Sequence, residues 1–313
     1  SLHDALPICF EAHYMDYQAN FFKQCGQSRF SMLADNVKQP FNEYLGLLLN
    51  FGIIGLLVLL LLMVIIIYCY RKNPSVEKQI AFYSLSSIGI FSFFSYPFAY
   101  PFVWVVTFLS IFIITSEYIK PLFSNILIKK IACMFILTYS LFGSSKLFER
   151  IQAELDWGKA STLALCKSYN ETLPTYERLE KMFVSNPYFL YNYAAVLQEM
   201  KQYTESLEVA LKCRQYWADY DLELIIGENY QQLNKPELAE KYYNSASMMC
   251  PSRFLPLYKL FYLYKTNGEK ERSLAMAEAV ISKPMKIKTT TIRMMKREME
   301  REIQKMNMSI KLE

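Results

Sequence analysis

The residues that could do chemistry near the start of the chain are a polar pair, Asn42 and Glu43, which is followed at once by a long apolar stretch. The pair lies in FNEYLGLLLNFGIIG, residues 41–55. A carboxylate in this place could act as a general base in a polar site at a membrane surface. The ordinary alternative is a helix start, in which Asn42 is the N-cap and Glu43 favours the positive end of the helix dipole.

The apolar stretch is predicted to be the first of about four transmembrane helices in a membrane domain over residues 44–145. Tyr44–Tyr70 contains no charged residue and would be about 40 Å long as a helix, enough to cross a hydrocarbon layer of roughly 30 Å. Its glycines could also serve only close helix packing. Three further crossings are predicted near Ile80–Tyr96, Pro101–Ser116 and Ile131–Ser145, the first two separated by the proline-containing SYPFAYP.

Basic residues mark the loops that are expected to face the cytoplasm. They follow the first and third predicted crossings, at Arg71, Lys72 and Lys78 and at Lys120, Lys129 and Lys130. By the positive-inside rule, the opposite ends then lie outside. The protein is therefore predicted to sit in a bacterial inner membrane, with residues 9–43 as the end of a periplasmic loop and with the remainder after Lys146 in the periplasm.

The second half of the chain carries helical repeats. Over Tyr220–Pro251, small and aromatic residues stand at tetratricopeptide spacing, in which small residues let two antiparallel helices approach and aromatic residues fill the space between them: Gly227, Tyr230, Ala239, Tyr243, Ala246 and Pro251. The pattern recurs 34 residues later and, with a slip of one residue, one repeat earlier, and a degenerate pair precedes these near Leu163–Phe183. We predict an all-α fold of polytopic transmembrane helices followed by a tetratricopeptide-type α-solenoid over residues 146–285, with a C-terminal capping helix over 286–313.

Composition excludes several classes of function. The net charge of +5 is mild, and no aromatic-and-basic motif indicates a nucleic-acid partner. The seven cysteines are odd in number and lack CxxC spacing, so neither a metal site nor a cofactor is predicted. Free, buried thiols are expected, and a Cys166–Cys213 or Cys213–Cys250 bridge stays open as an alternative.

The N-terminus indicates that the sequence is not the whole protein. It has no initiator Met, and SLHDALPI, residues 1–8, resembles a translated sequencing adapter. We expect native sequence to begin near Cys9 and the chain to be the C-terminal part of a longer protein.

With this layout, the opening stretch resembles O-antigen ligases and related Wzy-type polysaccharide polymerases. In that family a periplasmic loop ends in His, then Asn, Ser or Gln, nine residues, Gly, two residues and Gly. Asn42, Gly52 and Gly55 hold this spacing, and the repeats after the membrane helices resemble one branch of the family. The position of the histidine is occupied by Phe41.

The resemblance implies transfer of a glycan from an undecaprenyl-diphosphate carrier to a hydroxyl of a lipid, polymer or protein acceptor. Because Phe41 has no proton chemistry, Glu43 becomes the substitute base, with Asp35 second and His13 third. The cations near the donor diphosphate would be Arg29, Lys23 and Lys38. The other arginines of the family would lie upstream, so this part of the enzyme is expected to be inactive alone.

A second function from another class is a membrane-anchored tetratricopeptide adaptor without chemistry, whose repeats bind a protein partner. The main argument for this alternative is that Phe41 occupies the position of the family histidine. The tyrosines near the start of the repeats could either stack on sugar rings or form the repeat core; they are Tyr188, Tyr191, Tyr193 and Tyr216, beside Trp217.

Overall fold

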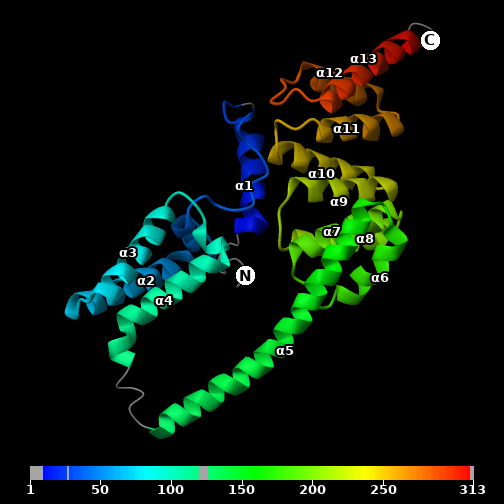
Figure 1. The fold of residues 1–313 in the computed structure, drawn as a ribbon. Helices are drawn as coiled ribbons and strands as arrows, with labels where there is room; N and C mark the ends of the chain where they lie inside the picture. Colours follow the sequence, from blue (N-terminus) through cyan, green and yellow to red (C-terminus); the bar gives the residue numbers. More distant parts are fainter. Residues whose placement is uncertain (1–9, 27, 120–125, 311–313) are drawn as a thin grey trace. The chain divides into compact units, whose positions relative to one another are not determined.

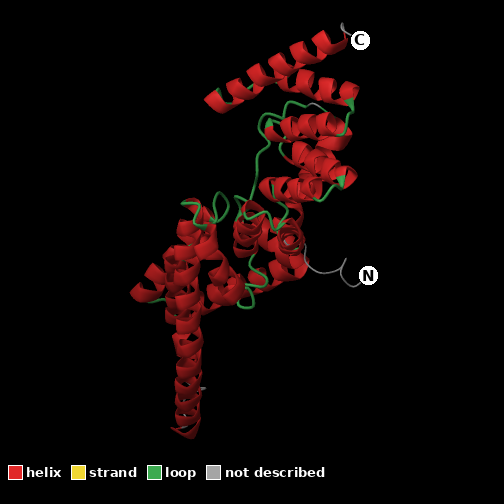
Figure 2. Cartoon of the chain, turned by 90° about the vertical axis from the view of Figure 1, so that its right-hand side faces the viewer, coloured by secondary structure: helices red, strands yellow, loops and turns green. Residues whose placement is uncertain are grey.

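The computed structural model describes residues 10–26, 28–119 and 126–310, and every regular element within them is a helix (Figures 1 and 2), as the predicted all-α class requires. The predicted adapter residues 1–8 lie outside the described residues. The chain divides into two compact units. The first contains Lys38–Glu154, and the second combines Glu11–Val37 with Leu155–Glu313.

The first unit is built from apolar helices. It contains α2 (Glu43–Lys72), α3 (Val76–Phe91), the short 3₁₀ helix η2 (Pro97–Ala99), α4 (Pro101–Ile119) and the first part of α5 (Ile126–Leu165). The prolines of SYPFAYP begin η2 and α4, so the predicted break between the second and third apolar segments is present.

Two helices among the described residues, α2 and α4, are long and apolar enough to cross a membrane. None of the most apolar window of α2 is buried within the protein. Helix α3 has 16 residues, and the fourth predicted crossing, residues 131–145, lies inside α5, which has 40 residues. The prediction of about four crossings is therefore not confirmed.

Helix α2 bends at Gly52, whose φ of 64° and ψ of −165° interrupt its helical geometry. A positive φ is strained for residues with a Cβ atom, and glycine adopts it readily. The glycine that was expected to serve helix packing therefore makes a kink.

A buried charge stabilises the loop ends of this unit. Lys78 is 3% exposed, and its Nζ lies 2.9 Å from Oε2 of Glu117 on α4. Asn73, just after α2, donates to the same oxygen at 2.9 Å. The interaction joins the α2–α3 loop to α4.

The second unit contains α1 (Phe10–Cys25, from Glu11 onward), the end of α5 and eight further helices (Figure 1). These are α6 (Tyr169–Leu179), α7 (Pro187–Glu199), α8 (Tyr203–Arg214), α9 (Tyr220–Gln232), α10 (Pro236–Met249), α11 (Leu255–Thr266), α12 (Lys270–Ser282) and α13 (Thr290–Ile310). Consecutive helices from α6 to α13 pack on one another, so the unit is the predicted array of helical pairs. The boundary predicted at Lys146 falls within α5, since no proline interrupts that helix.

The turn inside each helical pair has the same backbone. One residue has a positive φ, and the N–H of the next residue donates to the carbonyl five positions before it, which closes the helix end. The positive-φ residues are Lys167, Lys201, Asn234 and Gly268, and the closing bonds run from Ser168 to Leu163, Gln202 to Leu197, Lys235 to Tyr230 and Glu269 to Tyr264. The intervals of 34, 33 and 34 residues between these turns confirm the predicted slip of one residue and the pair that precedes the clear repeats.

The core of the clearest repeat is formed by an aromatic ring against a glycine. Tyr243 of α10 is fully buried, and a Cβ atom added to Gly227 of α9 would lie 2.6 Å from its ring. Tyr243 also donates a hydrogen bond to Gln231 at 2.8 Å. The close approach of α9 and α10 therefore requires the glycine.

Replacing Gly227 by alanine is expected to destabilise the array by about 1–3 kcal/mol, the usual cost of overpacking a well-packed core. The measurement is the free energy of urea unfolding of the detergent-solubilised chain, followed by tryptophan fluorescence. Gly158→Ala is the matched control, because no atom lies within 4 Å of an added Cβ at that helical glycine. An equal effect of both substitutions would contradict the packing argument.

Candidate functional site on the repeat unit

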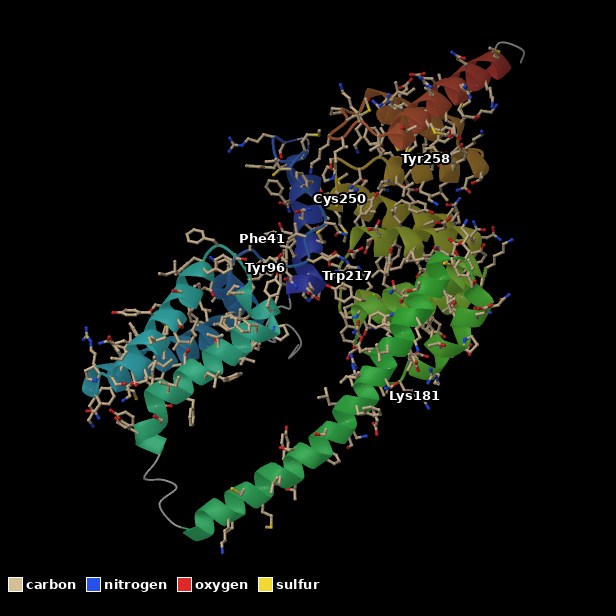
Figure 3. The ribbon with its side chains drawn as sticks, viewed as in Figure 1. Phe41, Tyr96, Lys181, Trp217, Cys250 and Tyr258 are labelled. Carbon is tan, nitrogen blue, oxygen red and sulfur yellow. The ribbon has the colours of Figure 1, made fainter. Side chains whose placement is uncertain are left out.

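The repeat array holds a segment from the distant N-terminal part of the chain. Residues 11–37, predicted to end a loop, form α1 and the chain after it. The Ala218 N–H donates to the carbonyl of Glu11 at 2.8 Å. Met15 is 1% exposed and belongs to the same buried cluster as Ala218 and Cys250. Figure 3 shows Trp217 and Cys250 on the edge of the array that α1 lines.

This edge, called the docking edge below, is formed by the links between successive pairs and the helix ends beside them: residues 214–220 from the end of α8 to the start of α9, 249–254 from the end of α10, and 283–286 after α12. Gln18 of α1 donates to the Met249 carbonyl at 2.6 Å and to the Asp35 carbonyl at 3.1 Å. Asn36 donates to Oδ2 of Asp219 at 2.7 Å, while Oδ1 of Asp219 caps α9. The segment is therefore bound through main-chain and side-chain groups alike.

An arginine between two carboxylates joins α1 to the array. Arg214 of α8 forms ion pairs with Asp16 of α1 and with Glu223 of α9, the latter at 2.5 Å. The side chain of Glu223 is only 2% exposed. Burial raises its pKa, although the nearby guanidinium opposes that shift. The ion pair with Arg214 thus offsets the free-energy cost of burying the Glu223 carboxylate.

A second ionic contact fixes the other end of the segment. Asp35 lies 2.8 Å from Arg253 and 3.5 Å from Lys286. Partial burial raises the pKa of Asp35, but the hydrogen bonds from Arg253 and from the Asn36 N–H, together with both cations, outweigh it and hold the pKa below 3.8. A carboxylate in this environment is a weakened base.

The predicted site residues at the start of α2 make structural contacts. Asn42 accepts from the Leu45 N–H at 2.8 Å and is the N-cap of α2. It also donates to the Phe93 carbonyl at 3.0 Å. Glu43 accepts from the Phe98 N–H at 3.0 Å. The ring of Phe41, at the position of the family histidine, lies 5.6 Å from that of Tyr96 (Figure 3).

The remaining candidates are distributed over both units. His13 and Lys23 are exposed on α1, and Arg29 lies over the ring of Phe30 at 4.8 Å. Lys38 begins the main segment of the first unit. A catalytic or diphosphate-binding role for these side chains stays a prediction.

Sequence reasoning missed the residues that bind α1. Met15, Arg214 and Arg253 were not among the candidates, although Tyr14, Met15, Ala19 and Phe22 follow helical spacing and indicate an apolar face. The pattern shows that such a face exists, but not which surface covers it.

The tyrosines considered for sugar stacking lie in aromatic clusters. The rings of Tyr188 and Tyr191 are 5.2 and 5.7 Å from that of Trp217, which is 4% exposed. Tyr193 stacks on Tyr176 at 5.5 Å. Tyr193 is buried in the repeat core and Tyr191 is half-buried, while Tyr188 and Tyr216 are each 37% exposed.

The described cysteines are free thiols, so neither the Cys166–Cys213 nor the Cys213–Cys250 bridge is present. Only Cys69, Cys213 and Cys250 are buried; Cys25, Cys133 and Cys166 are exposed. Within the described ranges, no group of three His, Cys, Asp or Glu side chains is arranged to hold a metal ion.

No protein-family model matches the chain, and no curated protein matches it. Similar solved structures are repeat proteins. One is YrrB, described as a TPR protein with an unusual peptide-binding site, at 19% identity and a TM-score of 0.37, covering 41% of this chain and 66% of that one. MamA matches at 13% identity and a TM-score of 0.39 over 49% of this chain and 89% of that one. A double mutant of MamA from RS-1 matches at 18% identity and a TM-score of 0.38 over 48% and 76%.

The prediction that the protein is part of a glycan ligase or polymerase is therefore wrong. The similar structures are tetratricopeptide proteins, and the described residues contain two candidate crossings, where a polytopic enzyme was expected. The comparisons give no support to the resemblance to O-antigen ligases. The findings favour the adaptor alternative.

Replacing Arg214 by methionine is expected to destabilise the array by about 3 kcal/mol, because Glu223 stays buried without its partner. Amide hydrogen exchange should also show α1 losing protection. Arg178→Met is the control, since its ion pair with Asp156 is largely exposed and should cost less than about 1 kcal/mol. Unchanged protection of α1 in Arg214→Met would show that this ion pair does not hold the segment.

Replacing Asp35 by asparagine is expected to cost about 0.5–1 kcal/mol at neutral pH, since the ion pair is half-exposed. The folded-state pKa lies below the unfolded one, so this contribution is present above the unfolded pKa and is lost as the pH falls through the folded pKa. Urea unfolding of the chain and of the variant should therefore differ at pH 7 and converge as the pH falls through the folded-state pKa of Asp35. A difference that persists at low pH would exclude the charge as its source.

Proposed function

We propose that the protein is a membrane-anchored adaptor whose tetratricopeptide-type unit binds helical segments of partner proteins along the docking edge. The observation that carries this proposal is the occupant of that edge, the segment Glu11–Val37 of the same chain, which contains the helix α1. An amphipathic helix laid into an apolar surface is a recurring mode of peptide recognition. Here an apolar anchor, main-chain bonds and ion pairs act together.

The contacts define the chemistry of the segment that the edge accepts. Met15 supplies the buried anchor and Tyr14 packs beside it. Asp16 forms an ion pair with Arg214, and Gln18 donates a hydrogen bond to the carbonyl of Met249 at the end of α10. A partner helix with an aromatic–methionine–acid sequence followed by an amide two residues later would reproduce these contacts.

The exposed apolar helices of the first unit support the anchoring part of the proposal. Leu61, Val64 and Phe108 are 60–62% exposed, and an apolar surface of this kind is unfavourable in water. Trp104, 46% exposed, would lie in the interfacial aromatic belt. By the positive-inside rule, we place the protein in a bacterial inner membrane with the repeats in the periplasm.

The test uses a labelled synthetic peptide of residues 10–37 and the full chain in detergent. In the wild-type chain the edge is occupied, so binding of the peptide should be weak. In a Met15→Lys chain the internal segment loses its anchor, and fluorescence anisotropy should show the peptide binding at least about tenfold more tightly, the equivalent of about 1.4 kcal/mol.

Two controls make the result specific to the edge. The peptide with its own Met15→Lys change should not bind the Met15→Lys chain, and the wild-type peptide should not bind a chain that carries both Met15→Lys and Arg214→Met. Circular dichroism establishes that each variant keeps its helices. If the folded Met15→Lys chain does not bind the wild-type peptide, the proposal is wrong.

A further inference from the structure

The last helix of the array, α13, has two faces of different chemistry. Its inner face packs on α11 and α12 through Met299, which is fully buried, and through partly buried apolar side chains at Ile292, Met295, Ile303 and Met306. This contact accounts for the end-capping role expected of the helix. It leaves the opposite face uncovered by the described residues.

The outer face carries a row of three arginines, Arg293, Arg297 and Arg301, all of them exposed. A spacing of four residues puts them on one face, about 6 Å apart along the axis. Among the residues that the structure describes, none forms an ion pair with these three. Like charges at this spacing repel one another and destabilise a helix, so the row lacks a stabilising role within the array.

Two of the three acidic residues of α13 bond to the array, and the third, Glu300, is exposed beside the arginines. Glu298 accepts hydrogen bonds from Tyr258, at 2.9 Å, and from Tyr262. Glu302 pairs with Lys265 of α11 and with Lys305, the latter at 2.8 Å. Three arginines against the one exposed glutamate, Glu300, leave the outer face net cationic.

Apolar side chains share the cationic face. Met294 and Met308 are each 63% exposed, and their helical spacing places them beside the arginines. An arginine row flanked by flexible apolar side chains suits a surface of anionic headgroups, in which guanidinium groups bind phosphate oxygens while methionines enter the interface.

We infer that the outer face of α13 is a binding site for anionic phospholipid headgroups, which would bring the end of the repeat array onto a membrane surface. The inference relies on the proposed membrane anchorage only for the nearness of lipid. A lipid surface fits better than an acidic protein because mobile headgroups can meet every guanidinium in a row that has no fixed complement. Each arginine near an anionic surface should strengthen partitioning about fivefold.

The test places the full chain in nanodiscs of neutral phosphatidylcholine and adds separate vesicles that contain phosphatidylglycerol. Wild-type nanodiscs should sediment with the anionic vesicles but not with neutral ones. The triple variant R293Q/R297Q/R301Q should bind about 100-fold more weakly. The control K181Q/K235Q/K241Q removes the same charge from exposed positions elsewhere in the repeat unit and should bind as the wild type does.

Sedimentation of the arginine variant at the wild-type level would overturn the inference. Binding of a labelled oligoglutamate peptide by a wild-type chain that does not bind the anionic vesicles would also overturn it, since that result indicates an acidic protein partner. Failure to enter nanodiscs contradicts the anchorage alone. The same vesicle comparison is then made with chain kept soluble by amphipol.

Discussion

The repeat unit depends on one backbone constraint, the left-handed residue at the turn inside each helical pair. At Lys167, Lys201, Asn234 and Gly268 the chain takes a positive φ, and the following residue closes the end of the first helix. This geometry reverses the chain within a few residues, so the second helix packs against the first. Because the turn recurs at nearly constant intervals, every pair presents its other end, the link to the next pair, along one edge.

The docking edge follows from that regularity. Asp219, Met249 and Arg253 come from links that are far apart in sequence, and stacking brings them within reach of one bound segment. Two of them are placed by the local geometry of a helix end. Asp219 caps α9, and the Met249 carbonyl lies at the end of α10, where no further turn of the helix donates a hydrogen bond to it. Binding therefore uses atoms that any helical array must place at its edge, and Arg214 and Arg253 add selectivity for acids.

The all-α class, the repeat spacing and the proline break could be predicted because each depends on local pattern. The docking of α1 could not, since the pairing of Asp16 with Arg214 joins residues 198 positions apart and depends on the register of the array. The spacing that suggested a transferase has a local explanation in helix geometry: Asn42 is an N-cap, Gly52 makes a kink, and a Cβ at Gly55 would lie 2.6 Å from that of Phe51. Residue spacing alone does not separate these roles from catalysis.

The buried and the exposed thiols of the chain differ in how readily they are oxidised. Cys213 and Cys250 lie in the array core, where burial raises the pKa of each to about 12. At neutral pH the reactive thiolate of such a group is present at a fraction on the order of 10⁻⁵, and oxidants act on the thiolate. In an oxidising compartment the two thiols in the core of the repeats would therefore stay reduced. Oxidation would mark the chain at its exposed thiols, among them Cys25 at the end of the docked helix.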